Sequence, residues 1–384
     1  MSTVNEVFSP VTITNYGKRV VDGVTQHNPL WALLKEKGKI ERNVSGDAFT
    51  WNLEAGRHDV HITSDDQDVS DLYTPRARWK RPQLDWGQIS SFRRFGKGIL
   101  RQNAGKEALV KVRDKEIPAM YRDAIFGTNG LHYQILNQAG AGYTGNGLPM
   151  YGLPSLFSAV TWSDSTKEGV IGTGSTYAGL PMYLSGLAAN GVDGAERDAW
   201  TPTAVNTTSS AWAGGTGAQT FRDNAFEILT YALTRTDRFS NNDPSKRASL
   251  ILLTQEMFTD LGYKIEGKQT VFVSRKVGAD EAQGIGTNTD MLYHGGRPVV
   301  WDENLPAATG YCLILDMLGL AIQPKAEWGK VPDSGMGTEG EDSDWFELDL
   351  DYNTSRRSLL ASITLPGQFR IDSPRGVTQL YAGA

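Results

Sequence analysis

The chain has 384 residues, a formal net charge of −6 and one cysteine, Cys312. A single cysteine excludes an intramolecular disulfide and a thiolate zinc site within one chain. The acidic balance argues against a general nucleic-acid binder, whose affinity comes from an excess of Lys and Arg. The longest apolar runs, 250–253 and 312–315, are strand-sized, so we expect no membrane span. The N-terminus lacks the basic and apolar regions of a secretory signal, so none is expected either.

Residues 1–27 are polar and β-leaning without a clear period, which favours an extended arm. A short helix is expected to follow. Asn28 is a good cap, Pro29 suits the first helical position and Gly38 ends the helix. Its apolar face would carry Leu30, Leu33 and Leu34.

A strand over 48–53 is expected to pair with a returning strand over 85–92. The residues between and just after them lack a core pattern, and acidic residues precede basic ones: Asp59, Asp65, Asp66, Asp68, Asp71, then Arg76, Arg78, Lys80, Arg81, Arg93, Arg94 and Lys97. So long a connection is either functional or disordered. We interpret it as a projecting ribbon with oppositely charged sides. An EF-hand starting at Asp65 fails because Ser70 stands where glycine is needed, which leaves an irregular cation site or a solvated or partner-facing acidic edge.

The interval from Asn103 to Gly127 predicts one long helix, because apolar residues recur at helical spacing among charges. At about 1.5 Å per residue it would be about 35 Å long. Pro118 removes one backbone hydrogen bond and is expected to kink it. Gly127 is expected to end it in a left-handed conformation.

Residues 128–183 are rich in Gly, Tyr and Pro and favour loops with short strands. Residues 185–219 favour an exposed excursion held down by Trp200 and Trp212. A helix is then expected from Thr220, whose hydroxyl can cap it. Its buried side would carry Phe221, Ala225, Ile228, Leu229 and Ala232.

The following region predicts a sheet with helices on it. A short helix is expected between a cap at Thr254 and a stop at Gly262. Strands are expected over 248–253, 297–301 and 311–315.

The C-terminal region has the clearest strand pattern. Apolar Phe346, Leu348, Leu350 and Tyr352 alternate with Glu347, Asp349 and Asp351. A second strand carries Leu359, Ala361, Ile363 and Leu365, and 377–381 is interpreted as a third. Three carboxylates on one face need cations nearby, and Arg356, Arg357 or the basic stretch 76–97 are the candidates.

No catalytic constellation emerges, so we do not expect an enzyme and expect no cofactor or metal. The Gly140-x-Gly142-x-x-Gly145 motif runs into Asn-Gly-Leu-Pro, which cannot open a long helix, so a flexible loop is favoured. His58 and His61 lack a third zinc ligand, and Asp342 and Asp344 lie in a Gly-rich acidic loop. Cys312, in an apolar strand, is expected to be an inert buried thiol.

Several short motifs occur in a specific order: Asn28-Pro29-Leu30, Asp85-Trp86, Gly105-Lys106-Glu107-Ala108, Gly152-Leu153, Ser175-Thr176-Tyr177-Ala178-Gly179-Leu180, Leu250 to Gln255 with Met257-Phe258, and Gly296 to Asp302. In this order the chain resembles the major capsid proteins of tailed bacteriophages, whose shell fold is shared with encapsulins. The resemblance covers nearly the whole chain.

The resemblance implies an α+β shell fold and an icosahedral shell, made of hexamers and pentamers, that encloses a phage genome. Its segments would be an N-terminal arm (1–45), an extended β-hairpin loop (46–102), a spine helix with the first part of the peripheral domain (103–150), an axial domain (151–310) and the C-terminal peripheral strands (311–384). The residues expected at subunit contacts are Asp65, Asp66, Asp68, Arg76, Arg78, Lys80, Arg81, Arg93, Arg94, Glu347, Asp349 and Asp351. Pro118 would set a bend in the spine.

The resemblance also implies partners. These are further copies of the chain, a portal, and decoration proteins in some shells. Because no long N-terminal extension precedes the arm, we expect a separate scaffolding protein or an already processed chain. Double-stranded DNA would be enclosed without sequence-specific binding, with no membrane involved. The expected location is the virion, after assembly in the cytoplasm of the bacterial host.

Two alternatives stay open. An encapsulin-like nanocompartment would enclose a cargo enzyme instead of DNA. A soluble enzyme or glycan-binding module would use the aromatic region from Tyr177 to Trp212.

Overall fold

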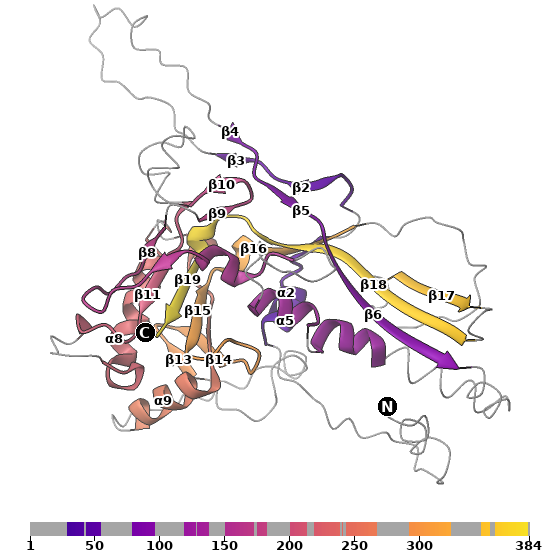
Figure 1. The fold of residues 1–384 in the computed structure, drawn as a ribbon. Helices are drawn as coiled ribbons and strands as arrows, with labels where there is room; N and C mark the ends of the chain where they lie inside the picture. Colours follow the sequence, from indigo (N-terminus) through magenta and orange to yellow (C-terminus); the bar gives the residue numbers. More distant parts are fainter. Residues whose placement is uncertain are drawn as a thin grey trace, which may run out of the picture.

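Two larger β-sheets and a projecting hairpin organise the chain in the computed structural model (Figure 1). The structure describes residues 29–41, 44–54, 79–96, 119–127, 129–137, 150–172, 175–182, 200–212, 219–238, 240, 243–266, 292–323, 347–353 and 358–382. Among the helices in these ranges, none is long and apolar enough to cross a membrane.

The first sheet has six strands in the order β11-β19-β15-β12-β14-β13. Their bounds are β11 (Thr203–Asn206), β12 (Leu250–Leu253), β13 (Leu292–His294), β14 (Arg297–Trp301), β15 (Thr309–Leu313) and β19 (Val377–Tyr381). Strand β12 is parallel to β14 and antiparallel to β15. The sheet predicted for this half of the chain is confirmed.

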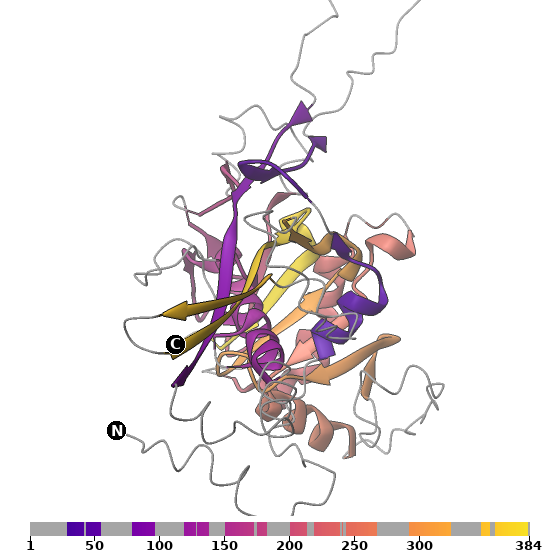
Figure 2. The ribbon, with the colours of Figure 1, turned by 90° about the vertical axis from the view of Figure 1, so that its right-hand side faces the viewer.

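Helices α8 (Phe221–Thr236) and α9 (Gln255–Glu266) pack on one face of this sheet (Figures 1 and 2). As predicted, the Thr220 hydroxyl accepts a hydrogen bond from the backbone N–H of Asp223 at 3.3 Å. The predicted buried side of α8 is also confirmed. Gly262, however, does not close α9, because its backbone is not left-handed and the helix continues to Glu266.

Strand β12 separates two hydrophobic cores, one on each face of the six-stranded sheet. Ile251 and Leu253 pack with the helices α8 and α9, whereas Leu250 and Leu252 pack in the larger core on the opposite face. All four side chains are fully buried. A strand covered on both faces needs an uninterrupted apolar run, which is what 250–253 provides.

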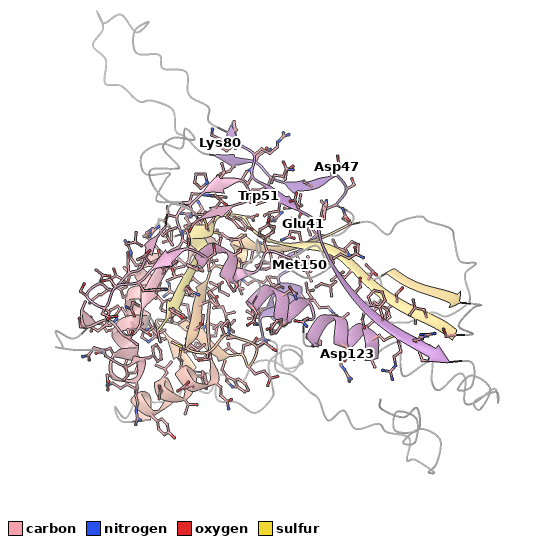
Figure 3. The ribbon with its side chains drawn as sticks, in the orientation of Figure 1. Glu41, Asp47, Trp51, Lys80, Asp123 and Met150 are labelled. Carbon is pink, nitrogen blue, oxygen red and sulfur yellow. The ribbon has the colours of Figure 1, made fainter. Side chains whose placement is uncertain are left out.

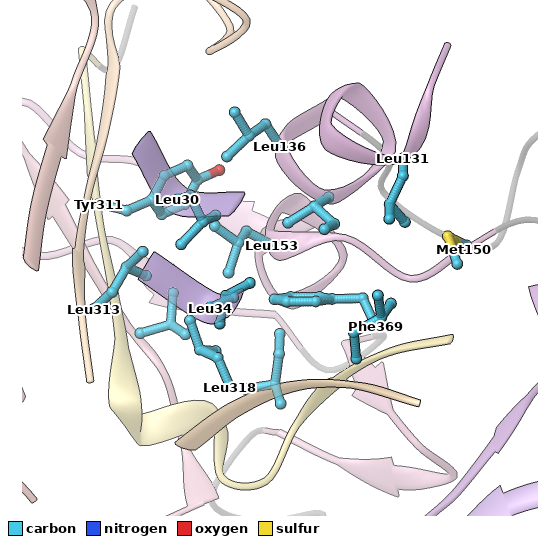
Figure 4. Packing of buried hydrophobic residues seen from close by; sticks show 14 of the residues in the cluster. Leu30, Leu34, Leu131, Leu136, Met150, Leu153, Tyr311, Leu313, Leu318 and Phe369 are labelled. Carbon is cyan, nitrogen blue, oxygen red and sulfur yellow. The ribbon is translucent and has the colours of Figure 1, made fainter. Parts of the chain in front are cut away.

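The larger core lies between the two sheets (Figure 4). Helices α2 (Pro29–Glu36) and α5 (Leu131–Asn137) enter it. Residues meeting there include Leu30, Leu34, Leu131, Leu136, Leu153, Tyr311, Leu313, Leu318 and Phe369. The α2 prediction is confirmed, with Leu30 and Leu34 buried and Gly38 left-handed at φ 62° just beyond the helix. The loops and short strands expected over 128–183 did not include α5.

The second sheet is built on the long strand β18 (Ser358–Ile371). Its other strands are β1 (Ile40–Glu41), β6 (Gly87–Gly96), β16 (Leu318–Ile322) and β17 (Glu347–Asn353). Ala361, Ile363 and Leu365 point to one face and are fully buried. Met120 and Ala124 belong to the same core, so the helical residues 119–126 lie against this face.

Short strands form the remaining pairs. Strands β2 (Ala48–Thr50) and β5 (Gln83–Asp85), with β3 (Leu53–Glu54) and β4 (Trp79–Lys80), make the projecting ribbon. Two small hairpins are β7 (Val160–Thr161) with β8 (Val170–Ile171), and β9 (Thr176–Tyr177) with β10 (Leu180–Pro181). Short 3₁₀ turns are η2 (Leu153–Phe157), η4 (Pro244–Lys246), η6 (Leu315–Met317) and η8 (Pro374–Gly376).

The predicted return strand over 85–92 is only partly right. Asp85 pairs with Ala48 in the ribbon, but residues 87–96 leave the ribbon and pair with β18 over ten positions. The break comes at Trp86, whose buried indole donates to the carbonyl of Gly46 at 2.8 Å. One extended segment therefore serves two sheets.

The predicted strand over 377–381 is confirmed as β19, but it does not pair with the other two C-terminal strands. Strand β19 lies between β11 and β15 in the six-stranded sheet. Leu380 of β19 packs beneath α8, whereas Val377 packs in the larger core. Because β19 is buried on both faces, it belongs to the six-stranded sheet. The predicted segment boundary at 310/311 also falls inside β15.

The expected exposed excursion over 185–219 is also wrong where the structure describes it. Trp200 and Trp212 are buried, as expected of residues that anchor the segment. The chain between them is buried too, because it forms strand β11. The Trp212 indole donates to the carbonyl of Asn206 at 2.6 Å. Residues 183–199 and 213–218 lie outside the described residues.

Gly127 ends the helical residues 119–126, but it is not left-handed. Its N–H still bonds the carbonyl of Asp123 at 2.8 Å, and a Cβ there would lie 2.4 Å from that oxygen. The left-handed residue is Asn129, at φ 66°, and Asn tolerates this conformation better than most residues. Glycine is thus needed at 127 for close approach. Residues 103–118, including Pro118, lie outside the described residues.

Candidate functional site

The side of the second sheet that faces away from the core is the first candidate surface. Antiparallel partners share a face, and the register aligns Ser90 with Thr364 and Glu347, Phe92 with Ser362 and Asp349, and Arg94 with Leu360 and Asp351. We call these nine positions of β6, β18 and β17 the outer face.

Phe92 is the most unexpected residue of the outer face. Its side chain is 66% exposed, although a large aromatic residue normally finds cover in a folded chain. Its neighbours on the face are polar: the hydroxyls of Ser90 and Thr364 lie 3.3 Å apart. Aromatic residues are enriched at protein interfaces relative to the rest of the surface, which makes this face a candidate interaction surface.

The two predicted contact residues Arg93 and Arg94 lie on opposite faces of β6. Arg94 is exposed on the outer face, and its Nε donates to the hydroxyl of Ser358 at 2.9 Å. Arg93 alternates to the core side, the side of buried Phe95, and is half-buried. Only Arg94 therefore joins the outer face.

The predicted acidic residues Glu347, Asp349 and Asp351 all fall on the outer face by register. Arg94 shares that face two strands away from Asp351, a separation of about 10 Å at the usual spacing of neighbouring strands. The face thus has an acidic edge on β17 and an aromatic and basic edge on β6.

The ribbon is the second candidate surface. Strand β4 carries Trp79 and the predicted contact residue Lys80, and Arg81 follows it. Trp79 is 57% exposed and Arg81 is exposed, whereas Lys80 is half-buried. Because alternate residues share a side, Trp79 and Arg81 project together. Figure 3 shows Lys80 toward the outer end of the ribbon and Trp51 at its base.

The base of the ribbon is anchored to the body by aromatic residues. Phe49 packs against Trp86 with ring centroids 5.8 Å apart, and the guanidinium of Arg370 lies 5.4 Å from the Phe49 ring. The Trp51 indole donates to the carbonyl of Asp372 at 3.2 Å. Burial raises the pKa of the Asp372 carboxyl, partly offset by Arg370 beside it.

A break separates the anchored part of the ribbon from its outer part. Strands β2–β5 and β3–β4 follow one continuous register, from Thr50 opposite Gln83 to Leu53 opposite Lys80. Between them, Trp51 donates to the carbonyl of Pro82 at 3.4 Å. Proline has no N–H to return the bond, so the ladder is interrupted there.

The remaining predicted contact residues, Asp65, Asp66, Asp68, Arg76 and Arg78, lie outside the described residues, as do His58, His61, the glycine motif at 140–145, Asp342 and Asp344. Cys312 is buried as expected, and burial raises the pKa of its thiol to about 12. In the part of the chain that the structure describes, no group of three His, Cys, Asp or Glu side chains is placed to hold a metal.

Sequence reasoning missed the exposure of Phe92 and Trp79. The alternation in β6 mixes Ser, Phe and Arg on both faces, so a local pattern cannot tell which aromatic residue is covered. The adjacent basic residues are no guide either, because buried Phe95 adjoins the same Arg93-Arg94 pair as exposed Phe92.

No protein-family model and no curated protein matches the chain. Among solved structures, a chain of the capsid asymmetric unit of cyanophage A-1(L) superposes with a TM-score of 0.59 at 16% identity, over 98% of this chain and 99% of that one. This chain has the fold of that phage capsid. The α+β capsid fold predicted from the sequence is therefore confirmed.

Two weaker likenesses also involve capsid-type shells. A chain of the capsid of a native GTA particle matches with a TM-score of 0.48 at 13% identity, over 97% of this chain and 96% of that one. A chain of the holo-SrpI encapsulin complex from Synechococcus elongatus PCC 7942 matches with a TM-score of 0.48 at 8% identity, over 96% of this chain and 92% of that one.

Proposed function

We propose that the chain is the major subunit of an icosahedral phage capsid, assembling as hexamers and pentamers around packaged double-stranded DNA. The observation that carries the proposal is the likeness to the cyanophage A-1(L) capsid, which extends over nearly the full length of both chains. In a shell the product is the assembly itself, so the chemistry needed is that of interfaces and not of a catalytic centre.

In this proposal the ribbon of one copy lies on the outer face of the next. The ribbon sequence is acidic first and basic afterwards, and the outer face has acidic positions on β17 and a basic residue, Arg94, on β6. Complementary charges across an interface set register and suppress wrong partners more than they add affinity. The same charges would orient each subunit against its neighbour.

The proposed domains follow the two sheets. Residues 1–45 form the arm and 46–102 the extended loop, whose strand β6 continues into the second sheet. That sheet and residues 103–150 form the peripheral domain. The six-stranded sheet with α8 and α9 forms the axial domain around the five-fold and six-fold positions. Because β15 and β19 belong to that sheet, the axial domain includes them in addition to residues 151–310. The C-terminal peripheral strands are then β16, β17 and β18.

The proposed partners follow from the shell. A separate scaffolding protein guides assembly, a portal occupies one vertex and decoration proteins bind some shells of this kind. The net charge of −6 suits a wall that must stand beside DNA without adhering to it. The finished protein resides in the virion after assembly in the host cytoplasm.

A nanocompartment shell that encloses a cargo enzyme is the second candidate, because the shell fold that the sequence resembles is shared with encapsulins. A glycan-binding module in the region 177–212 is disfavoured. Tyr177, Trp200 and Trp212 are all buried, with at most 2% of each side chain exposed, so their rings are not available to stack on a sugar.

Electron microscopy of the expressed chain tests the proposal. The expected result is closed, megadalton particles on size-exclusion chromatography and in micrographs, alone or with the scaffolding protein. A small discrete oligomer under both conditions overturns it. Particles purified from infected or producing cells decide between the two shells: nuclease-protected DNA supports the capsid, and a single enriched protein cargo supports the nanocompartment.

A further inference from the structure

We infer that Trp79 of one copy packs against Phe92 of the adjacent copy, so that an aromatic contact anchors the ribbon on the outer face. The inference rests on the proposed function and names the residues that would hold its central interface. It starts from exposure: Trp79 and Phe92 are 57% and 66% exposed.

Both rings have the character of an interface anchor. Tryptophan, tyrosine and arginine dominate the binding energy of most interfaces, in patches surrounded by polar residues that exclude water. Trp79 projects beside Arg81, and Phe92 beside Ser90 and Arg94. Two aromatic rings gain most from edge-to-face or offset packing, with centroids about 4.5 to 7 Å apart.

The outer face offers Arg81 both a like charge and opposite charges, because Arg94 flanks Phe92 whereas the carboxylates lie on β17. Arg81 accompanies Trp79 on the ribbon, while Asp349 shares the register position of Phe92 on the outer face and Asp351 lies one step further along. Seating Trp79 on Phe92 therefore brings a guanidinium toward an acidic strand. Planar guanidinium groups bind carboxylates in a fork geometry, which fixes orientation as well as distance.

The two rings cannot meet within one chain. Trp79 lies on β4 and Phe92 in the middle of β6, with the extended strand β5 between them, and thirteen residues at about 3.3 Å each span about 40 Å. A contact between different patches of identical chains is head-to-tail. Such contacts close into rings when the rotation between copies permits, which is the geometry of a hexamer or pentamer.

Cysteine cross-linking in assembled particles tests the contact. The variant Trp79→Cys/Phe92→Cys is treated with a short bismaleimide, because a disulfide requires Cα atoms within about 7 Å and the rings, not the Cα atoms, are expected to meet. The native Cys312 is buried and contributes no background. A ladder of covalent oligomers on a denaturing gel, ending at the ring size, is expected.

The control pair is Trp79→Cys/Val170→Cys, since Val170 is 69% exposed but lies on β8, away from the outer face. Particles that give no ladder with the first pair, or an equally strong ladder with the control pair, overturn the inference. If wild-type chain forms no particles at all, the proposed function fails instead, so the two failures are distinguishable.

A second measurement covers the case in which the cysteine pair does not assemble. A photoreactive benzoylphenylalanine replaces Trp79 and is co-assembled with an excess of wild-type chain, which supplies Phe92. Mass spectrometry that maps the photoproduct to residues 87–96 of another copy supports the contact. Photoproducts confined to other segments, or an equal yield of photoproduct at 87–96 from Val170→benzoylphenylalanine, overturn it.

Discussion

Nε2 of His132 lies 2.7 Å from Oδ2 of Asp302, and both side chains are at most 1% exposed. The pair joins α5 to the residue that follows β14, and Asp302 also accepts hydrogen bonds from the backbone and side-chain nitrogens of Asn304 at 2.9 and 3.2 Å. Loss of the imidazole would leave the buried Asp302 carboxylate without this hydrogen-bond partner, and an uncompensated buried charge is costly.

His132→Ala is therefore expected to lower the free energy of unfolding by about 3 to 5 kcal/mol. The double variant His132→Ala/Asp302→Asn should lose less, because no charge stays buried and Asn keeps an acceptor for Asn304. Urea unfolding of the unassembled subunit, followed by circular dichroism, checks both values. A double variant less stable than His132→Ala would show that the carboxylate is not the source of the cost.

Arg94→Glu is expected to reduce particle yield severely while leaving the melting temperature of the subunit unchanged, because Arg94 lies exposed on the outer face and the new charge joins an acidic strand. Arg93→Glu should instead lower the melting temperature, because Arg93 is half-buried on the core side. Sedimentation of assembled particles and thermal melts separate the two effects. Arg222→Glu, at an exposed position on α8, is the matched control and should assemble normally.

Asp372→Asn is expected to be more favourable to stability at pH 7 than at pH 3. Burial raises the pKa of this carboxyl in the folded chain, so ionising it costs more folded than unfolded, and its contribution is lost as pH rises through the folded pKa. At low pH the carboxyl is protonated in both states and resembles the amide. The urea midpoints of wild type and variant are compared at the two pH values. A stability advantage of the variant that is larger at pH 3 than at pH 7 would contradict the prediction.

Cys312 should resist thiol reagents in the native subunit and react fully in guanidinium chloride. Its side chain is fully buried and its pKa is raised to about 12, so almost no thiolate forms at neutral pH, and the thiolate is the reactive species. Absorbance with a disulfide reagent under both conditions measures this directly. Rapid native labelling at pH 7 would mean that β15 opens easily.

Pro82→Ala is expected to slow amide exchange in the ribbon on both sides of the break. The new N–H can return the bond to the Trp51 carbonyl and join the two ladders, which already share one register. Hydrogen exchange read by mass spectrometry over 48–54 and 79–85 checks this. Pro366→Ala, in the second sheet, serves as the control; unchanged exchange for Pro82→Ala would place the cause of the break elsewhere.

Structural elements determined by neighbouring residues could be predicted from the sequence, whereas those that depend on pairing between distant segments could not. The start of α8 follows from the Thr220 cap, and β12 follows from its apolar run, because both signals lie within a few residues. The sheet of β19 depends on β11 and β15, far away in the chain, and no local alternation distinguishes one sheet from another.

The candidate surfaces divide in the same way. Charge placed Arg94 and the β17 carboxylates among the contact candidates, since an alternating strand reveals which residues share a face. It could not separate Arg93 from Arg94, because the orientation of β6 is set by its ten-residue register with β18. The His132–Asp302 pair spans 170 positions and has no motif that would announce it.

Strand β18 carries a mechanical consequence. It pairs with β6, β17 and β16, and its chain then passes through η8 directly into β19 of the six-stranded sheet. A pull on the second sheet is therefore delivered to the first along covalent backbone and rows of ladder bonds loaded in shear, which must fail together. In the proposed shell, this covalent connection between β18 and β19 would transmit load between the two sheets of each subunit.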